Sequence, residues 1–214
     1  MWWAFLVCGV IGYGVGSVPT GLLVGRVVRG IDIRQYGSGK TGATNVMRTV
    51  GARWGVVALL GDLAKGVAPV LIARLISDEP YVQTVAGLAA AVGHDFPIFA
   101  GFSGGRGVAT SYGAALAMSP IPAAALLPVG IGVVAATRTM SLMSLGPAPV
   151  LAALFVVLAA TGYHSWAYAV YAVSAAAMVV VLHRENIERL IAGTEPKIGR
   201  SGEQRAASPG EQGS

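Results

Sequence analysis

Long uninterrupted blocks of apolar residues constrain the fold of this chain more than any other feature of its sequence. A helix needs about 20 mostly apolar residues to cross the hydrocarbon core of a bilayer, and several blocks are of that length. Of the 214 residues, 54% are hydrophobic and 12% are charged, and this charged share is about half that of an ordinary soluble domain. The chain has too little charge for a water-facing surface, so we expect an integral membrane protein.

The apolar blocks predict an all-α polytopic bundle with about seven transmembrane helices. The predicted spans are 2–28, 54–76, 81–100, 107–118, 121–137, 142–161 and 165–182. The fourth span is short. The Ser-Pro-Ile-Pro segment 119–122 is therefore a turn only if the fourth span reaches the far side of the membrane, and otherwise the fourth and fifth segments form one kinked helix. Five or six spans are the alternatives.

The distribution of Lys and Arg predicts the orientation, because loops rich in these residues are held on the cytoplasmic side. Thirteen of the 15 Lys and Arg lie in alternate connecting segments, which are 26–53, 101–107, 138–141 and 183–214. The loops that contain neither residue are 77–80, 119–122 and 162–164. We therefore expect a multi-pass protein of the cell (inner) membrane, with the N-terminus outside and the C-terminus in the cytoplasm.

Residues 1–195 are predicted to form one membrane domain, and residues 196–214 a disordered cytoplasmic tail that is rich in Gly, Ser, Glu, Gln and Arg.

The net charge of +5 arises mostly from the basic residues that set the topology, and it has a secondary use in attracting anionic substrates and lipid headgroups. We find no nucleic-acid-binding module. The single cysteine, Cys8, lies in the first apolar block, which excludes a disulfide framework and a cysteine-based metal site.

Polar function in a membrane protein concentrates where polar residues interrupt or border the spans, and we find three such segments on the predicted cytoplasmic side. The first is 36–48, with the sequence YGSGKTGATNVMR. Its glycines let backbone N–H groups approach an anion closely, while side chains such as Ser38, Thr41, Asn45 and Arg48 add hydrogen bonds and charge. This segment predicts a phosphate-binding loop, and a flexible connector is the alternative.

Two nucleotide-binding patterns match this loop in part. Gly39-Lys40-Thr41 resembles the end of a P-loop, but the position that requires glycine is occupied by Arg34. The glycines at positions 37, 39 and 42 have the dinucleotide-binding spacing, but they follow a membrane span and no βαβ unit surrounds them. We therefore reject both nucleotide hypotheses.

The second segment is 101–107, GFSGGRG, where four glycines and Arg106 precede a predicted helix. Free N–H groups at a helix N-terminus and a guanidinium together favour an anion, although a tight turn with a topology-setting arginine is also possible. His94-Asp95 lies just upstream, where a structural histidine is as plausible as a functional one. In the second span, Asp62 and Lys65 are three residues apart and are expected to form a structural pair that faces the active cavity.

The third segment follows the last span and begins His183-Arg184-Glu185-Asn186. His183 and Asn186 share one face of a helix, because residues three apart are neighbours on its surface. From the residues alone, a polar cap at the membrane edge and a functional pair are equally plausible.

Taken in order, these residues resemble the bacterial acyl-phosphate:glycerol-3-phosphate acyltransferases of the PlsY type. The resemblance covers roughly residues 10–196. The motifs that carry it are 16–21 (GSVPTG), 38–48, 62–66 (DLAKG), 93–97 (GHDFP), 104–110 (GGRGVAT), 183–187 (HRENI) and 193–195 (GTE).

The resemblance implies a seven-helix enzyme that transfers a fatty acyl group from acyl phosphate to the 1-hydroxyl of glycerol 3-phosphate, giving lysophosphatidic acid and phosphate in the first step of phospholipid synthesis. The implied partners are these two substrates and membrane lipid, with no cofactor, metal or nucleic acid. The implied catalytic residues are His183, Asn186 and Ser38. The implied substrate-binding residues are Ser38, Gly39, Thr41, Gly42, Asn45, Arg48, Gly104, Gly105, Arg106 and Gly107.

The chain departs from the pattern of that family at three positions. Lys40 replaces the usual Asn, while Ser103 and Arg106 replace the usual Lys. Arg106 keeps the positive charge in a forked group, and we expect Lys40 to restore the charge missing at Ser103. These departures concern substrate affinity more than the type of reaction.

The predicted chemistry suits these residues, because an acyl phosphate is already activated and needs no covalent nucleophile on the enzyme. The proton of the attacking hydroxyl can leave to His183 or to the departing phosphate, and the sequence does not decide between them. The alternative function is an organic-phosphate membrane transporter. A transporter of this kind is expected to carry polar residues near the middle of the membrane in two related halves of the chain. Near the middle of the predicted spans, Asp62 and Lys65 are almost the only charged residues, and we find no inverted repeat.

Overall fold

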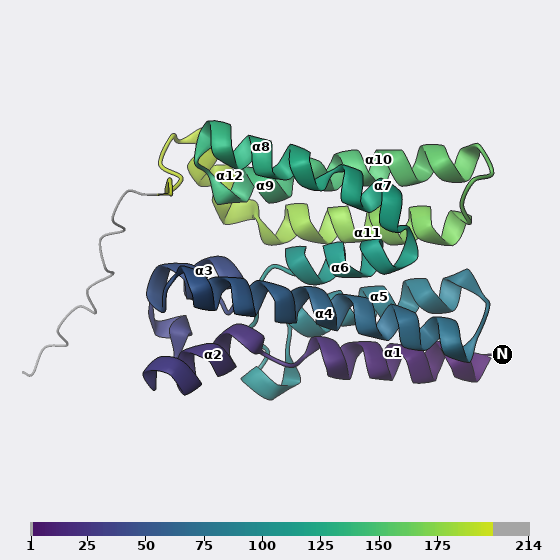
Figure 1. Cartoon of the computed structure of the whole chain (residues 1–214), viewed down its shortest axis with the longest axis horizontal. Coiled ribbons are helices and arrows are strands. Elements are labelled where there is room, and N and C mark those ends of the chain that lie inside the picture. The colour runs from purple at the N-terminus through teal and green to yellow at the C-terminus, as the bar shows by residue number, and fades with distance from the viewer. Residues whose placement is uncertain (1, 199–214) are drawn as a thin grey trace, which may run out of the picture.

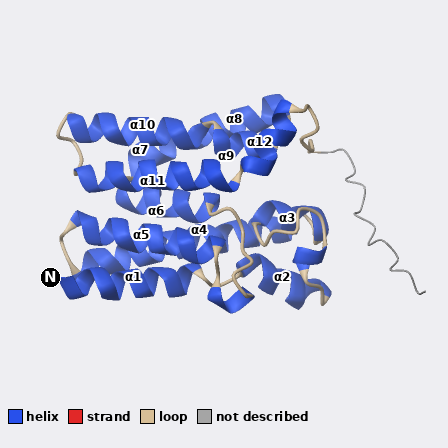
Figure 2. Ribbon diagram, turned by 180° about the vertical axis from the view of Figure 1, so that it is seen from behind, coloured by secondary structure: helices blue, strands red, loops and turns tan. Residues whose placement is uncertain are grey.

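The structure is a computed structural model that describes residues 2–198, and all regular elements in that range are helices (Figures 1 and 2). The α-helices are α1 (Trp2–Gly16), α2 (Thr20–Arg29), α3 (Ala43–Thr49), α4 (Ala52–Ile76), α5 (Pro80–Asp95), α6 (Val108–Met118), α7 (Pro120–Ala125), α8 (Leu127–Thr137), α9 (Met140–Leu145), α10 (Pro147–Ala160), α11 (Trp166–Leu182) and α12 (Arg184–Ile191). Two 3₁₀ turns, η1 (Ile33–Gln35) and η2 (Ile98–Ala100), lie in the connecting segments. Most of the predicted tail, from residue 199 onward, lies outside the described residues.

Four helical segments of the described chain are long and apolar enough to cross a membrane. They are Trp2–Arg29, Ala52–Ile76, Pro120–Thr137 and Met140–Ala160. The bent pair α11–α12 raises the number to five if it counts as one span. At 16 and 11 residues, α5 and α6 are too short to be counted in this way. The all-α membrane class is confirmed, and the count of about seven crossings stays a prediction.

The helices run roughly side by side along the long axis of the molecule (Figure 1). The turns that join α4 to α5 and α10 to α11 lie at one end of this bundle, together with the N-terminus. The short helices α2, α3 and α12 lie at the opposite end (Figures 1 and 2). The first and third polar segments of the sequence are therefore gathered at the same end of the bundle.

Close packing of small residues fixes how the helices meet. A Cβ added at Gly12 or Gly16 of α1 would collide with backbone atoms of Ala86 or Ala90 on α5. Likewise, a Cβ at Gly66 of α4 would collide with the carbonyl of Thr110 on α6. Small residues let backbones approach closely, which is the usual source of helix association in lipid. These contacts fix the packing of α1 against α5 and of α4 against α6.

The first predicted span, 2–28, is broken between α1 and α2. Pro19 is the residue that precedes α2, and proline cannot donate the backbone hydrogen bond that would continue a helix. At the break, the carbonyl of Val18 accepts one hydrogen bond from the N–H of Thr20 over 3.0 Å and another from Nζ of Lys65 on α4 over 2.8 Å. An irregular backbone is tolerated at membrane depth when protein groups satisfy it in this way.

Candidate active site

Asn45 organises the first polar segment. Its side chain is 2% exposed, and its Nδ2 group donates to the carbonyl oxygens of Ile33, Tyr36 and Lys40 at 2.9, 3.1 and 2.8 Å. Its Oδ1 atom accepts a hydrogen bond from the N–H of Ser38 over 3.0 Å. The amide therefore shapes the loop, and its direct contact with a substrate stays a prediction.

The remaining predicted residues of this segment are arranged around that amide. Gly37 and Gly39 have φ angles of +57° and +70°, values that glycine adopts without strain. Ser38 and Gly39 are exposed, Gly42 is half-buried at the start of α3, and Arg48 is exposed in its last turn. Thr41 is 3% exposed, so its side chain is less accessible to a ligand than the sequence suggested.

One contact joins the first segment to the second, and another joins residues that lie just before each of them. The N–H of Thr41 donates to the carbonyl of Gly104 over 3.5 Å. Nη1 of Arg34 donates to the carbonyl of Ala100 over 2.8 Å, while Asp32 holds the same guanidinium through its carboxylate. No sequence pattern predicts the contact of Arg34 with Ala100, because nothing local marks a partner 66 positions away.

The second segment forms a tight turn on the end of α5. The N–H of Gly105 donates to the carbonyl of His94 over 3.2 Å, and a Cβ at Gly104 would collide with that same carbonyl. Gly107 has a φ angle of +62° and precedes α6 directly. Gly104, Gly105 and Gly107 are buried, and Arg106 is half-buried between them.

His183, in the third segment, lies at the junction of α11 and α12 and is 3% exposed. Its Nδ1 atom is 2.7 Å from the carbonyl oxygen of Val179. A carbonyl can only accept, so Nδ1 carries the proton and the neutral ring has its lone pair on Nε2. Burial lowers the pKa of His183, as does the positive charge of Arg106, while the bond to Val179 and the charge of Glu195 act in the opposite direction.

Asn186 and Arg189 are held by one carboxylate, that of Glu195. Nδ2 of Asn186 donates to Oε1 over 2.7 Å, and Nε of Arg189 donates to Oε2 over 2.8 Å. Burial raises the pKa of Glu195, but the hydrogen bonds from Asn186 and Arg189 and the charge of Arg189 lower it by more, so the net shift is downward. Oδ1 of Asn186 is buried and has no partner among residues 2–198, so it can accept a hydrogen bond from a ligand hydroxyl.

Arg106 is the point where the three segments meet. Burial lowers its pKa, the positive charges of Arg189 and Arg48 lower it further, and Glu185 and Glu195 oppose them. Arginines from α3, from the turn before α6 and from α12 therefore act on one another. Glu195 already pairs with Arg189, so Arg48 and Arg106 are the members of this cluster that an anionic ligand would neutralise. Arg48 and Arg106 were predicted to bind substrate, whereas Arg189 was not.

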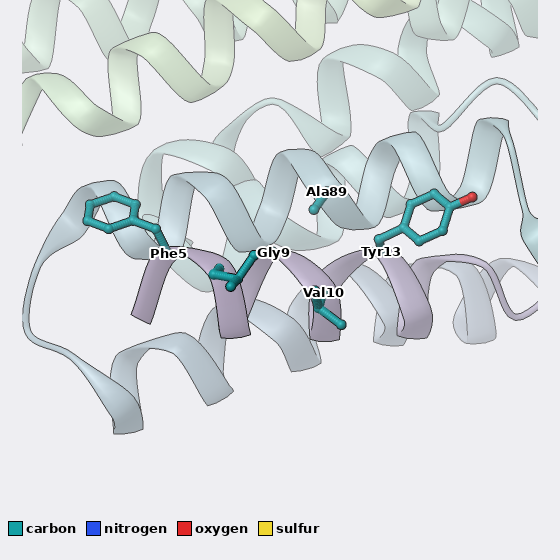
Figure 3. Close-up of a pocket in the computed structure, with 6 residues that line it drawn as sticks. Phe5, Gly9, Val10, Tyr13 and Ala89 are labelled. Atoms are coloured by element: carbon teal, nitrogen blue, oxygen red, sulfur yellow. The ribbon is translucent and has the colours of Figure 1, made fainter. Parts of the chain in front are cut away.

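An apolar groove of about 440 Å³ lies apart from this cluster, between α1 and α5 (Figure 3). It is lined by Phe5, Leu6, Gly9, Val10, Tyr13 and Ala89, none of which is a predicted site residue. No group of three or more His, Cys, Asp or Glu side chains in the described part of the chain is placed to hold a metal ion. The polar end of the bundle is therefore the candidate active site.

A helical bundle with several membrane-crossing segments carries, at one end, an arginine cluster beside a buried histidine and asparagine. These features define an integral membrane protein that acts on anionic molecules. Residues 6–193 match the protein-family model described as glycerol-3-phosphate acyltransferase. The chain therefore belongs to the glycerol-3-phosphate acyltransferase family, and it is an acyltransferase.

Individual relatives agree with this assignment. The glycerol-3-phosphate acyltransferase of Geobacter sulfurreducens is 47% identical over 194 residues, which is 90% of this chain and 97% of that protein. The enzyme of Synechococcus sp. strain CC9902 is 45% identical over 193 residues, covering 90% and 94% of the two chains.

A solved structure has the same fold. The crystal structure of PlsY (YgiH), an integral membrane glycerol 3-phosphate acyltransferase in its glycerol 3-phosphate form, is 36% identical, with a TM-score of 0.83 over 91% of this chain and 96% of that chain. The lysophosphatidic acid form of the same protein gives a TM-score of 0.81.

Proposed function

We propose that this enzyme transfers a fatty acyl group from acyl phosphate to the 1-hydroxyl of glycerol 3-phosphate, releasing lysophosphatidic acid and phosphate. The observation that carries the proposal is the buried pair of His183 and Asn186, in which Oδ1 of Asn186 has no partner among residues 2–198 and the charge of Arg106 acts on His183. Both substrates are phosphorylated, and a guanidinium matches a phosphate in charge and geometry. The PlsY structures in glycerol 3-phosphate and lysophosphatidic acid forms support this choice of acceptor and product.

In this reaction the hydroxyl oxygen attacks the acyl carbon, and the bond from that carbon to the phosphate oxygen breaks. Phosphate is a good leaving group, so the enzyme needs chiefly to bind, orient and neutralise charge. The turn from Gly104 to Gly107 and Arg106 hold the phosphate of glycerol 3-phosphate. Ser38 and Arg48 contact the phosphorylated substrates from the first segment.

His183 and Asn186 act on the attacking hydroxyl. With Nδ1 engaged by Val179, the Nε2 lone pair of His183 can take the hydroxyl proton. Oδ1 of Asn186, which has no partner in the described chain, accepts a hydrogen bond from the 2-hydroxyl of glycerol 3-phosphate and so orients the substrate with the proton of its 1-hydroxyl toward His183. Burial, together with the positive charge of Arg106, lowers the pKa of His183 and so favours the neutral imidazole, which can accept a proton.

The donor is the first point to test. We expect purified protein to incorporate radiolabelled glycerol 3-phosphate with acyl phosphate and not with acyl-CoA, because the family resemblance implies that donor and the cationic residues assigned to the site suit small phosphorylated groups. Product analysis should give the 1-acyl isomer. Comparable turnover with acyl-CoA would contradict the proposed donor while leaving the family unchanged.

We further propose about seven membrane crossings, an outside N-terminus and a cytoplasmic site in the inner membrane. The distribution of Lys and Arg supports this orientation. So does the position of the turn between α4 and α5, at the opposite end of the bundle from α3 (Figure 1).

Cysteine labelling checks this orientation. Ser38 and Asp78 are both exposed and lie in predicted cytoplasmic and outside loops, and the native Cys8 is buried and can be replaced by alanine. An impermeant thiol reagent on intact cells should label Asp78→Cys but not Ser38→Cys, and both should react once the membrane is opened. The reverse pattern would show that the proposed topology is inverted.

A further inference from the structure

A buried polar cluster lies inside the bundle, next to the second segment and outside the set of residues that the proposed reaction uses. Asp62, Lys65 and His94 are 2%, 6% and 5% exposed. Nζ of Lys65 lies 3.0 Å from Oδ1 of Asp62, and the hydroxyl of Thr20 donates to the same oxygen. A buried carboxylate is costly unless it is paired, so this cluster of partners keeps Asp62 in one position.

His94 connects this cluster to the second segment. Its Nδ1 atom lies 3.5 Å from Oδ1 of Asp62, a distance at which the interaction is mainly electrostatic, and it has no hydrogen-bond partner among residues 2–198. Its other ring nitrogen, Nε2, faces Gly105 so closely that a Cβ at position 105 would collide with it. Its carbonyl oxygen accepts the N–H of Gly105 over 3.2 Å. The turn at Gly105 therefore rests on the imidazole and is anchored by the backbone of the same residue.

We propose that His94 is a positioning residue, which sets the place of Gly105 and therefore the direction in which Arg106 presents its guanidinium. Asp62 lies beside one edge of the ring, and Gly105 packs against the other. Lys65 takes part in the same arrangement, because it pairs with Asp62 and also holds Val18 at the break between α1 and α2. The inference rests on the proposed role of the second segment in binding glycerol 3-phosphate.

The same contacts would be present if the cluster only stabilised the bundle, so the test must separate binding from stability. A merely structural loss lowers the melting temperature and the amount of active enzyme. Misplacement of a phosphate-binding turn instead raises the KM for glycerol 3-phosphate, because the phosphate contact is equally present in ground and transition states.

A double-mutant cycle between positions 94 and 105 makes this separation. Alone, Gly105→Ala and His94→Ala should each raise the KM for glycerol 3-phosphate about ten-fold, the scale of one weakened charge-assisted contact, with a smaller change in kcat. In the double variant the new methyl group occupies space that the imidazole vacated. We therefore expect its KM to be no higher than that of His94→Ala alone.

Gly87→Ala is the matched control. A Cβ at Gly87 would lie 2.9 Å from Cε of Met118 and 2.9 Å from Cε2 of Tyr171, inside the bundle and away from the second segment. We expect it to lower the melting temperature and to leave the KM unchanged. If His94→Ala does not fold, His94→Asn replaces it in the cycle, because Asn is smaller than His but keeps a polar group near Asp62.

The outcomes are distinct. The inference is overturned if the replacement at His94 leaves the KM unchanged, or if the fold increases in KM from the two single variants multiply in the double variant. It is supported if Gly105→Ala causes no further increase in KM once His94 has been replaced. Arg106→Ala, measured alongside, shows whether the second segment binds glycerol 3-phosphate at all. An unchanged KM in that variant would overturn the binding assignment and the inference together.

Discussion

Replacing His183 with alanine is expected to lower kcat by about 10²- to 10⁴-fold, the usual contribution of a positioned general base, with little change in the KM for glycerol 3-phosphate. The physical reason is which nitrogen of the imidazole ring carries the proton. Val179 fixes the proton on Nδ1, which leaves Nε2 able to accept the proton of the attacking hydroxyl. Steady-state kinetics in detergent or lipid, with folding checked by thermal melting, measures the effect.

The pH profile of kcat adds a second readout. Burial lowers the pKa of His183, so the neutral, proton-accepting ring persists to a lower pH than in an ordinary histidine. The acid limb of the profile should therefore lie below about pH 6.5 and should be absent from the residual activity of His183→Ala. A matched control is His164→Ala, in which the lost ring pairs with Ser119 elsewhere in the chain, and its kcat should be retained. An unchanged kcat in His183→Ala would indicate that the departing phosphate takes the proton.

Arg106→Ala is expected to raise the KM for glycerol 3-phosphate by about one to two decades, which corresponds to roughly 1.5–3 kcal/mol for one charge-assisted contact. The decrease in kcat should be at least several-fold smaller. The phosphate carries the same charge in the ground and transition states, so the lost contact is uniform binding. This is the reverse of the pattern expected for His183→Ala, and the same kinetic measurements give both.

A suitable control for Arg106 is Arg53→Ala. Arg53 is exposed just after the first segment, and its guanidinium lies 5.0 Å from the ring centre of Trp54 rather than in the arginine cluster. Its loss removes one positive charge from the same region and should leave the KM nearly unchanged. If Arg106→Ala leaves the KM unchanged as well, the second segment does not bind glycerol 3-phosphate, even though the family assignment stands.

Much of the fold could be predicted from the sequence because lipid imposes simple rules. Apolar blocks of span length and the uneven distribution of Lys and Arg led directly to an all-α membrane bundle. Finer features depend on local breaks that hydropathy does not report, such as the separation of α1 from α2 before Pro19. Helix α5 has only 16 residues, although a longer span was predicted, because a 3₁₀ turn replaces its last residues.

The sequence predicts the segments of the candidate site, and the roles of the individual residues in it stay predictions. Glycines and basic residues marked the loops, but Asn45 and Thr41 prove to be buried in the loop structure. The contribution of Arg189 depends on Glu195 and on the folding of α12 toward Arg106, which no local pattern reports. Thr41, the residue after Lys40, contacts Gly104, the residue after Ser103. Lys40 and Ser103 are therefore close in the fold, and the replacement of the charge missing at Ser103 by Lys40 stays a prediction.

The central claim is that three segments, far apart in sequence, build one site for a phosphorylated acceptor. An experimental structure of this protein with glycerol 3-phosphate bound tests it most directly. We predict that the phosphate lies against Arg106 and the turn at Gly105, with the 1-hydroxyl within hydrogen-bond distance of Nε2 of His183. A ligand that binds elsewhere, or that contacts only one of the three segments, would contradict the account.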